Sequence, residues 1–144
     1  MKIVKFGTAA WSGGIKDGKG FISTESGALK STPYGFNTRF EGTPGTNPEE
    51  LLGAAHAGCF TMALSKVLGD AGLKATSLDT KAEVTLEKKG EDFEINAVHL
   101  ILKGSAGGAT KEKFEELAYK AKENCPVSKL FKGAKITLDV NFSG

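Results

Sequence analysis

The fold of this chain is decided by the stretch NPEELLGAAHAGCFTMAL, residues 47–64. Asn47 can cap a helix, the proline after it suits the first helical position, and Glu50 lies three residues past the cap. Gly69 and Gly72 indicate the end of the helix, because glycine is typical of helix ends. The sequence therefore predicts one long helix over about 48–70.

The middle of this helix carries no charge from Leu51 to Leu64 and is apolar on nearly every face. A helix that is apolar all round must be buried all round. Since a small sheet covers only one side, we expect the other side to pack on the same helix of a second copy, in a C₂ homodimer. The alternative is a helix enclosed within one larger core.

The remaining elements are short strands and one further helix, arranged as an α+β fold in a single domain over 1–144. Alternation of apolar and polar residues predicts the strands, and helical spacing of apolar residues predicts the helix. The expected strands are 2–11, 19–25, Phe36–Phe40, a hairpin over 77–103 and a last strand over 134–142, with the second helix at about 110–123.

Composition excludes several partners. The 19 basic and 17 acidic residues are interspersed and give a net charge of +2, so no basic stripe is available for nucleic acid. No uncharged run reaches the ~18 residues of a membrane span, and the N-terminus lacks the pattern of a secretion signal. We expect a cytoplasmic protein that binds neither nucleic acid nor membrane.

The chain has two cysteines, Cys59 in the apolar helix and Cys125 before a proline. In a cytosolic protein such a pair is a redox couple or two inert core thiols. Burial in an apolar helix raises the pKa of a thiol. The helix dipole acts only within the first turn, and Cys59 lies about three turns into the helix, so the dipole does not lower its pKa. A reactive Cys59 therefore requires a cation from elsewhere.

Arg39 is the only arginine and a candidate for that cation, because its planar fork is permanently charged. Glu49 can orient it through a bidentate pair. Each also has a simpler interpretation, as a surface arginine and as a favourable carboxylate at a helix start. His56 and His99 are candidate bases, but their spacing from the cysteines is not that of zinc sites, so no metal is expected.

Three segments together resemble a known family: PYGFNTRFEG at 33–42, residues 45–64 and CPVS at 125–128. They are similar to the osmotically inducible protein C (OsmC) branch of the bacterial OsmC/Ohr family, over essentially the whole chain. The resemblance implies an OsmC-like α+β fold, in which antiparallel sheets pack around a long buried central helix. It also implies an intertwined homodimer that reduces organic hydroperoxides in oxidative and osmotic stress.

The resemblance further implies the role of each site residue. Cys59 matches the peroxide-attacking cysteine, Cys125 the resolving cysteine, and Arg39 with Glu49 the activating pair. No cofactor is implied. An external dithiol, for example one of the dihydrolipoamide type, would reopen the disulfide. The glycine-rich segment at 104–109 is shorter than the family pattern, which affects only a loop.

Apolar side chains near these residues are expected to line a substrate pocket. Apolar surface favours alkyl or lipid hydroperoxides over hydrogen peroxide, because only the former offer apolar area to bury. The expected lining residues are Phe36, Phe40, Leu52, Phe60 and Met62.

Helix geometry bears on which copy supplies the activating pair. Ten residues separate Glu49 from Cys59, which in a straight helix is about 15 Å along the axis and roughly 80° around it. We therefore expect Arg39 and Glu49 to act on the Cys59 of a second copy. A mobile loop that brings Arg39 to its own Cys59 is the alternative.

Two other classes of function remain open at this stage. One is a hydrolase in which Cys59 works with His56 or His99 and Cys125 has no role. The other is a non-catalytic dimer that binds a hydrophobic ligand, for which both cysteines are dispensable.

Overall fold

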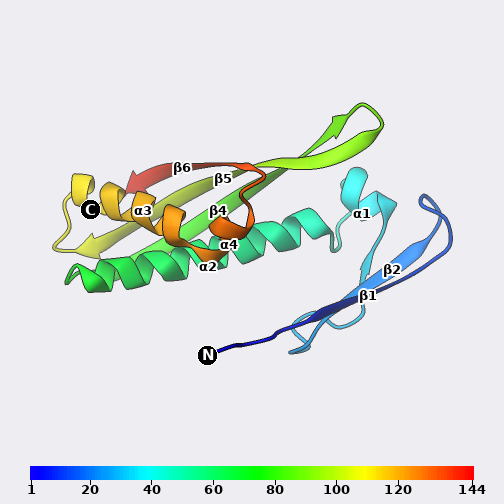
Figure 1. Ribbon diagram of the computed structural model, residues 1–144, viewed down its shortest axis with the longest axis horizontal. Coiled ribbons are helices and arrows are strands. Elements are labelled where there is room, and N and C mark those ends of the chain that lie inside the picture. Colours follow the sequence, from blue (N-terminus) through cyan, green and yellow to red (C-terminus); the bar gives the residue numbers. More distant parts are fainter. The chain divides into compact units, whose positions relative to one another are not determined.

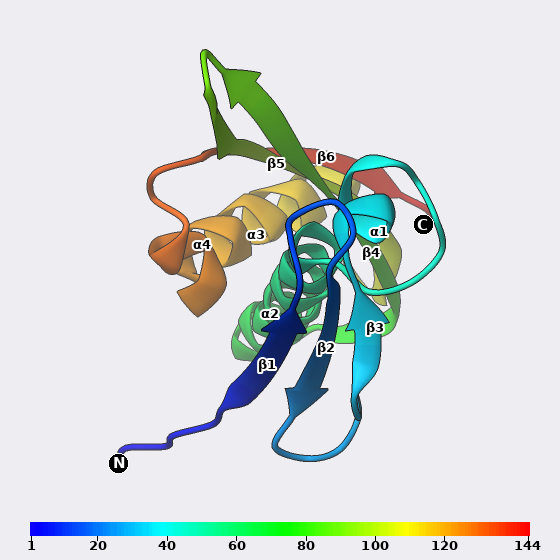
Figure 2. The same cartoon turned by 90° about the vertical axis from the view of Figure 1, so that its right-hand side faces the viewer.

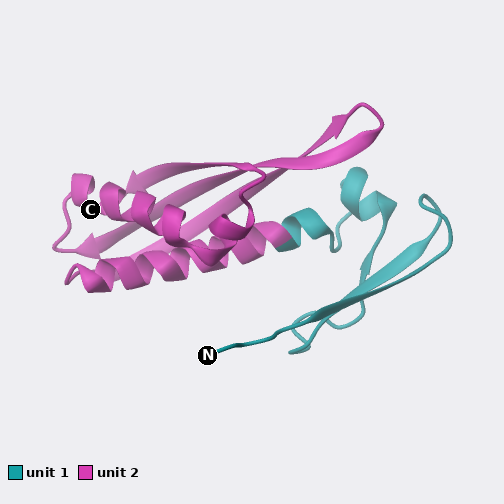
Figure 3. Ribbon diagram, viewed as in Figure 1, with its two compact units in different colours: residues 1–51 teal, residues 52–144 magenta.

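The structure is a computed structural model that describes residues 1–144. Its residues form two compact units, 1–51 and 52–144, which Figure 3 distinguishes by colour. The single domain predicted over 1–144 stays a prediction. In chain order the elements are β1 (Gly7–Ser12), β2 (Lys19–Thr24), β3 (Thr32–Tyr34), α1 (Phe36–Phe40), α2 (Pro48–Asp70), β4 (Lys74–Lys89), β5 (Asp92–Gly107), α3 (Lys111–Asn124), α4 (Pro126–Leu130) and β6 (Lys135–Phe142).

The first unit contains an antiparallel sheet in the order β1-β2-β3, followed by α1. The rings of Trp11 and Tyr34 meet edge to face, with centroids 5.5 Å apart. Both rings close over Gly20, where an added Cβ would lie within 2.4 Å of Tyr34. A glycine is therefore required at this point of the sheet.

The strand predicted over Phe36–Phe40 is wrong, because these residues form the short helix α1. The Thr38 hydroxyl accepts a hydrogen bond from the Gly35 N–H at 2.9 Å and lies 3.0 Å from the Gly35 carbonyl oxygen. Arg39 N–H also donates to that carbonyl. These local bonds stabilise a helical turn in a segment whose alternation is imperfect, and the third strand lies just before it.

The second unit is built on a sheet in the order β4-β5-β6. The predicted hairpin is present and longer than expected, as β4 and β5, whereas β6 pairs with β5 in parallel. The parallel pair departs from the antiparallel sheets expected, because α3 and α4 carry the chain back across the sheet before β6 begins. Gly104 is part of β5 and not of a loop, and an added Cβ there would meet Ser77 O at 2.5 Å.

Helices α2 and α3 pack on one face of this sheet, as Figures 1 and 2 both show. The bounds of α2 agree with the prediction, and Asn47 Oδ1 accepts the Glu50 N–H at 2.8 Å as the expected cap. One stripe of α2 is buried at helical spacing: Gly53, His56, Phe60, Leu64 and Leu68. The core forms between this stripe, α3 and the inner face of the sheet.

The opposite face of α2 is exposed and apolar in the single chain. Ala54, Ala55 and Gly58 are exposed, and so is Met62, whose exposed fraction is 78%. By length and composition α2 resembles a membrane-crossing helix, a test that core helices of soluble proteins also pass. The expectation that a second copy covers this face stays a prediction.

Replacing a core leucine tests whether the buried stripe of α2 supports the fold. Leu64→Ala removes a fully buried side chain, so the free energy of unfolding should fall by about 2–5 kcal/mol. Leu130→Ala is the matched control, because that side chain is 76% exposed and its loss should change stability by about 0.5 kcal/mol or less. Urea unfolding measures both, and equal effects of the two substitutions would contradict the packing described.

Candidate active site

The two cysteines lie against each other in the second unit. Cys59 is in the middle of α2, and Cys125 lies between α3 and α4. Both are free thiols, and the Cys125 S–H donates to Cys59 Sγ across 3.0 Å. A disulfide requires about 2.05 Å, so a small movement of either side chain suffices to join the two sulfurs.

The backbone around Cys125 explains why this thiol is held in place. Its N–H donates to Ala121 O at the end of α3, and its carbonyl accepts from Lys129 N–H in α4. Pro126 begins α4, where its missing N–H is not needed. Cys125 is thus the shared boundary of two helices and has no exposed surface.

The surroundings of Cys59 favour the protonated thiol. Burial raises the pKa of the Cys59 thiol, the hydrogen bond from Cys125 raises it further, and the Val127 N–H acts in the opposite direction. None of these groups is a cation. A thiolate at Cys59 therefore requires positive charge in addition to what these neighbours supply.

The two histidines have hydrogen-bond partners other than Cys59. His56 is fully buried, its Nε2 lies 2.8 Å from Ser128 Oγ, and its Nδ1 has no partner. Burial lowers the pKa of His56 and favours the neutral imidazole. His99 lies on β5, with Nδ1 2.5 Å from Thr137 Oγ1 and Nε2 2.9 Å from Asp139 Oδ2. No three histidine, cysteine or acidic side chains of the chain group as metal ligands do.

Arg39 and Glu49 form a bidentate pair within the first unit. Arg39 Nε donates to Glu49 Oε1 at 3.0 Å, and Nη2 donates to Oε2 at 2.9 Å. Glu49 is in the first turn of α2, and the guanidinium lies over the Phe40 ring, 5.4 Å from its centroid. The carboxylate and the ring together hold the planar fork in one orientation.

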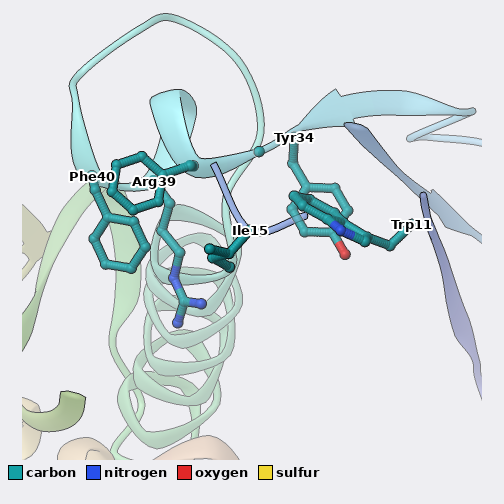
Figure 4. A pocket seen from close by; sticks show the side chains of 7 residues that line it. Trp11, Ile15, Tyr34, Arg39 and Phe40 are labelled. Atoms are coloured by element: carbon teal, nitrogen blue, oxygen red, sulfur yellow. The ribbon is translucent and has the colours of Figure 1, made fainter. Parts of the chain in front are cut away.

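A cavity of about 320 Å³ lies beside Arg39 in the first unit, and Figure 4 shows the side chains around it. Two residues expected in a substrate pocket, Phe36 and Phe40, line it. Trp11, Ile15 and Tyr34 also line it and were not anticipated from the sequence. Their only signal was a group of apolar side chains near the β1–β2 turn and at the end of β3.

The other expected pocket residues lie in the second unit. Met62 lines a cavity of about 620 Å³ together with Cys59, and Leu52 lines a different one with Phe131. Phe60 has no exposed surface, because it points from α2 into the core. The expectation that Phe60 lines a pocket is therefore corrected to a packing role.

Comparison with known proteins identifies the family of this chain. The family model described as OsmC-like protein matches residues 40–141. Peroxiredoxin OsmC of Escherichia coli (strain K12) is 55% identical over 139 residues, which cover 96% of each chain. Organic hydroperoxide resistance protein OhrB of Bacillus subtilis (strain 168) is 33% identical over 116 residues, covering 79% of this chain and 82% of OhrB.

Solved structures show the same fold. The crystal structure of OhrB of Bacillus subtilis matches with a TM-score of 0.70 and 28% identity, over 96% of this chain and 98% of that one. An organic hydroperoxide resistance protein from Elizabethkingia anophelis matches with a TM-score of 0.72 and 25% identity, over 99% and 100%. With a matched family model, a relative at 55% identity and this shared fold, the chain belongs to the OsmC-like protein family.

Proposed function

We propose that this chain is a thiol-dependent peroxidase that reduces organic hydroperoxides to alcohols. The observation that carries the proposal is the pair of free thiols, Cys59 and Cys125, whose sulfurs lie 3.0 Å apart. The names of the relatives, a peroxiredoxin and organic hydroperoxide resistance proteins, support it. Their names also support a part in defence against oxidative stress.

In the first step the Cys59 thiolate attacks the terminal peroxide oxygen. The S–O bond forms as the O–O bond breaks, and the alkoxide takes a proton to leave as the alcohol. Cys59 is left as a sulfenic acid. The Cys125 sulfur then displaces this oxygen as water and forms the Cys59–Cys125 disulfide. An external dithiol completes the cycle by thiol–disulfide exchange, and no cofactor is required.

The activating cation in this proposal is Arg39. Within its own unit the pKa of Cys59 is raised by burial and by Cys125, so the thiolate needs a positive charge nearby. The fork held by Glu49 can supply that charge and can also stabilise the charge that develops on the peroxide oxygens. We infer that it comes from a second copy, in a homodimer that covers the exposed face of α2.

The apolar cavity beside Arg39 supports an organic substrate. Aromatic and aliphatic side chains form most of its wall, and the guanidinium is its charged group. Such a site buries the organic part of a hydroperoxide and places its oxygens near the cation. Because both thiols must be reduced again in each cycle, the proposal includes a reducing, cytoplasmic location without membrane or nucleic-acid partners.

The two other classes of function make different demands on the site. A Cys–His hydrolase needs an imidazole directed at Cys59, whereas His56 is bonded to Ser128 and His99 to Thr137 and Asp139. A non-catalytic ligand-binding dimer has no need of two thiols in contact. Replacing each cysteine separates these classes from the peroxidase.

Cys59→Ser should reduce hydroperoxide consumption to the background of the buffer, because the attacking sulfur is gone. Cys125→Ser should undergo one oxidation and then stall, since its sulfenic acid has no neighbouring thiol. Mass spectrometry after one equivalent of cumene hydroperoxide should show one added oxygen on Cys59 in this variant. Normal multiple turnover by Cys125→Ser would overturn the resolving role, and Cys59→Ser with full activity would overturn the proposed function.

Co-refolding two inactive variants tests whether the site is shared between copies. Mixing Cys59→Ser with Arg39→Ala chains should give heterodimers with one complete site, and about a quarter of the natural activity. The matched control replaces the first partner by the double variant Cys59→Ser, Arg39→Ala, which leaves no complete site and should stay inactive. Activity no higher than this control would contradict a shared site.

A further inference from the structure

A buried hydrogen bond joins the two segments that carry the thiols. His56 Nε2 and Ser128 Oγ lie 2.8 Å apart, although 72 positions separate them in the chain. His56 has no exposed surface, and Ser128 is 7% exposed. The His56 ring also meets Phe131 edge to face, with centroids 5.3 Å apart. This contact therefore fastens α4 to α2 in the interior of the second unit.

The His56–Ser128 hydrogen bond lies about one helical turn from the sulfur contact in both segments. His56 comes three residues before Cys59 on α2, and Ser128 comes three residues after Cys125 at the start of α4. Residues three apart in a helix lie on the same face. The His56–Ser128 bond and the Cys125–Cys59 contact are thus two neighbouring ties between the same two segments.

A buried polar pair is an unexpected way to connect two helices for stability alone. Apolar side chains of similar volume would pack there without desolvating polar groups, and His56 Nδ1 is left buried without a partner. What a hydrogen bond adds over apolar packing is direction and distance. The His56–Ser128 pair is therefore suited to hold α4 in one defined position against α2.

The catalytic cycle requires such a defined position. Once Cys59 is a sulfenic acid, the Cys125 sulfur must approach Cys59 Sγ in line with the S–O bond, from the side opposite the oxygen, to displace it. Until the disulfide closes, the His56–Ser128 bond is the side-chain hydrogen bond that ties α4 to α2 in this placement, beside the backbone Val127 N–H that meets Cys59.

We propose that His56 and Ser128 are positioning residues that hold Cys125 against the oxidised Cys59 and so set the rate of disulfide closure. The inference rests on the proposed peroxidase function. In the step concerned, Cys59–SOH and Cys125–SH give the Cys59–Cys125 disulfide and water. The Cys125 sulfur provides the electron pair of the new S–S bond, and its proton leaves with the displaced hydroxide.

Ser128→Ala removes the tie from one side, and Ser128→Thr retains the hydroxyl. The protein is mixed rapidly with one equivalent of cumene hydroperoxide, and free thiols are trapped at successive times. This separates the oxidation of Cys59 from disulfide closure. We expect Ser128→Ala to slow closure about tenfold or more and to leave the first oxidation within about twofold. Ser128→Thr should recover most of the closure rate. Ser77→Ala, at an exposed serine on β4, is the matched control and should change neither step.

A double variant separates positioning from stability. His56→Leu combined with Ser128→Ala removes both polar partners, so no buried group loses its hydrogen bond and the fold should be retained. If the pair positions Cys125, closure in this variant should be as slow as in Ser128→Ala. Closure at the natural rate in a folded single or double variant would overturn the inference, and so would an equal slowing of both steps.

Equilibration with a dithiol redox buffer gives a readout that needs no peroxide. The disulfide of Ser128→Ala should be about tenfold easier to reduce, a shift of about 30 mV for a two-electron couple. An unchanged equilibrium would contradict the positioning role. If the natural chain forms its disulfide normally in the redox buffer but does not react with hydroperoxide, the proposed function is contradicted. The positioning role of the His56–Ser128 bond would not be affected by that result.

Discussion

The contact between the Cys125 S–H and Cys59 Sγ joins a 23-residue helix to a segment 66 positions further along the chain. It depends on the whole architecture of the second unit. The β4–β5 hairpin provides the sheet, α2 and α3 pack on one of its faces, and the proline after Cys125 ends one helix and begins another. Together these elements bring the sulfur of Cys125 to the sulfur of Cys59.

The surroundings of this contact also favour the protonated form of the Cys59 thiol. The same apolar surroundings that hold the two sulfurs together raise the pKa of the attacking thiol. The guanidinium that can offset this effect belongs to the first unit, where Glu49 and Phe40 fix its orientation. The thiols and the cation thus belong to different units of the chain, and the proposed homodimer is the assembly that would bring them together.

Local signals predicted the elements that depend on local interactions. The Asn47 cap marks the start of α2, and Gly72, with a positive φ, lies just beyond its end at Asp70. The strict alternation over 134–142 marks the last strand, because caps and pleats act within a few residues. The helix α1 was missed because hydrogen bonds between Thr38 and Gly35 outweigh a weak alternation. The parallel pairing of β6 with β5 was missed because no local pattern specifies the partner of a strand.

In the candidate site, the residue types and the resemblance indicated the cysteines and the arginine pair. The His56–Ser128 bond and the cavity wall formed by Trp11 and Ile15 were missed, because they depend on contacts between separate segments of the chain.

In the proposed function the paired thiols reduce the peroxide, and the apolar cavity beside Arg39 binds its organic group. The most direct measurement compares kcat/KM for cumene hydroperoxide and hydrogen peroxide, with dihydrolipoamide as the electron donor. If the organic group is bound by apolar burial, kcat/KM for cumene hydroperoxide should exceed that for hydrogen peroxide by at least about 100-fold, which corresponds to about 2.7 kcal/mol of additional transition-state binding. Equal values for the two peroxides, or no dithiol-dependent consumption of either, would rule out an organic hydroperoxide reductase.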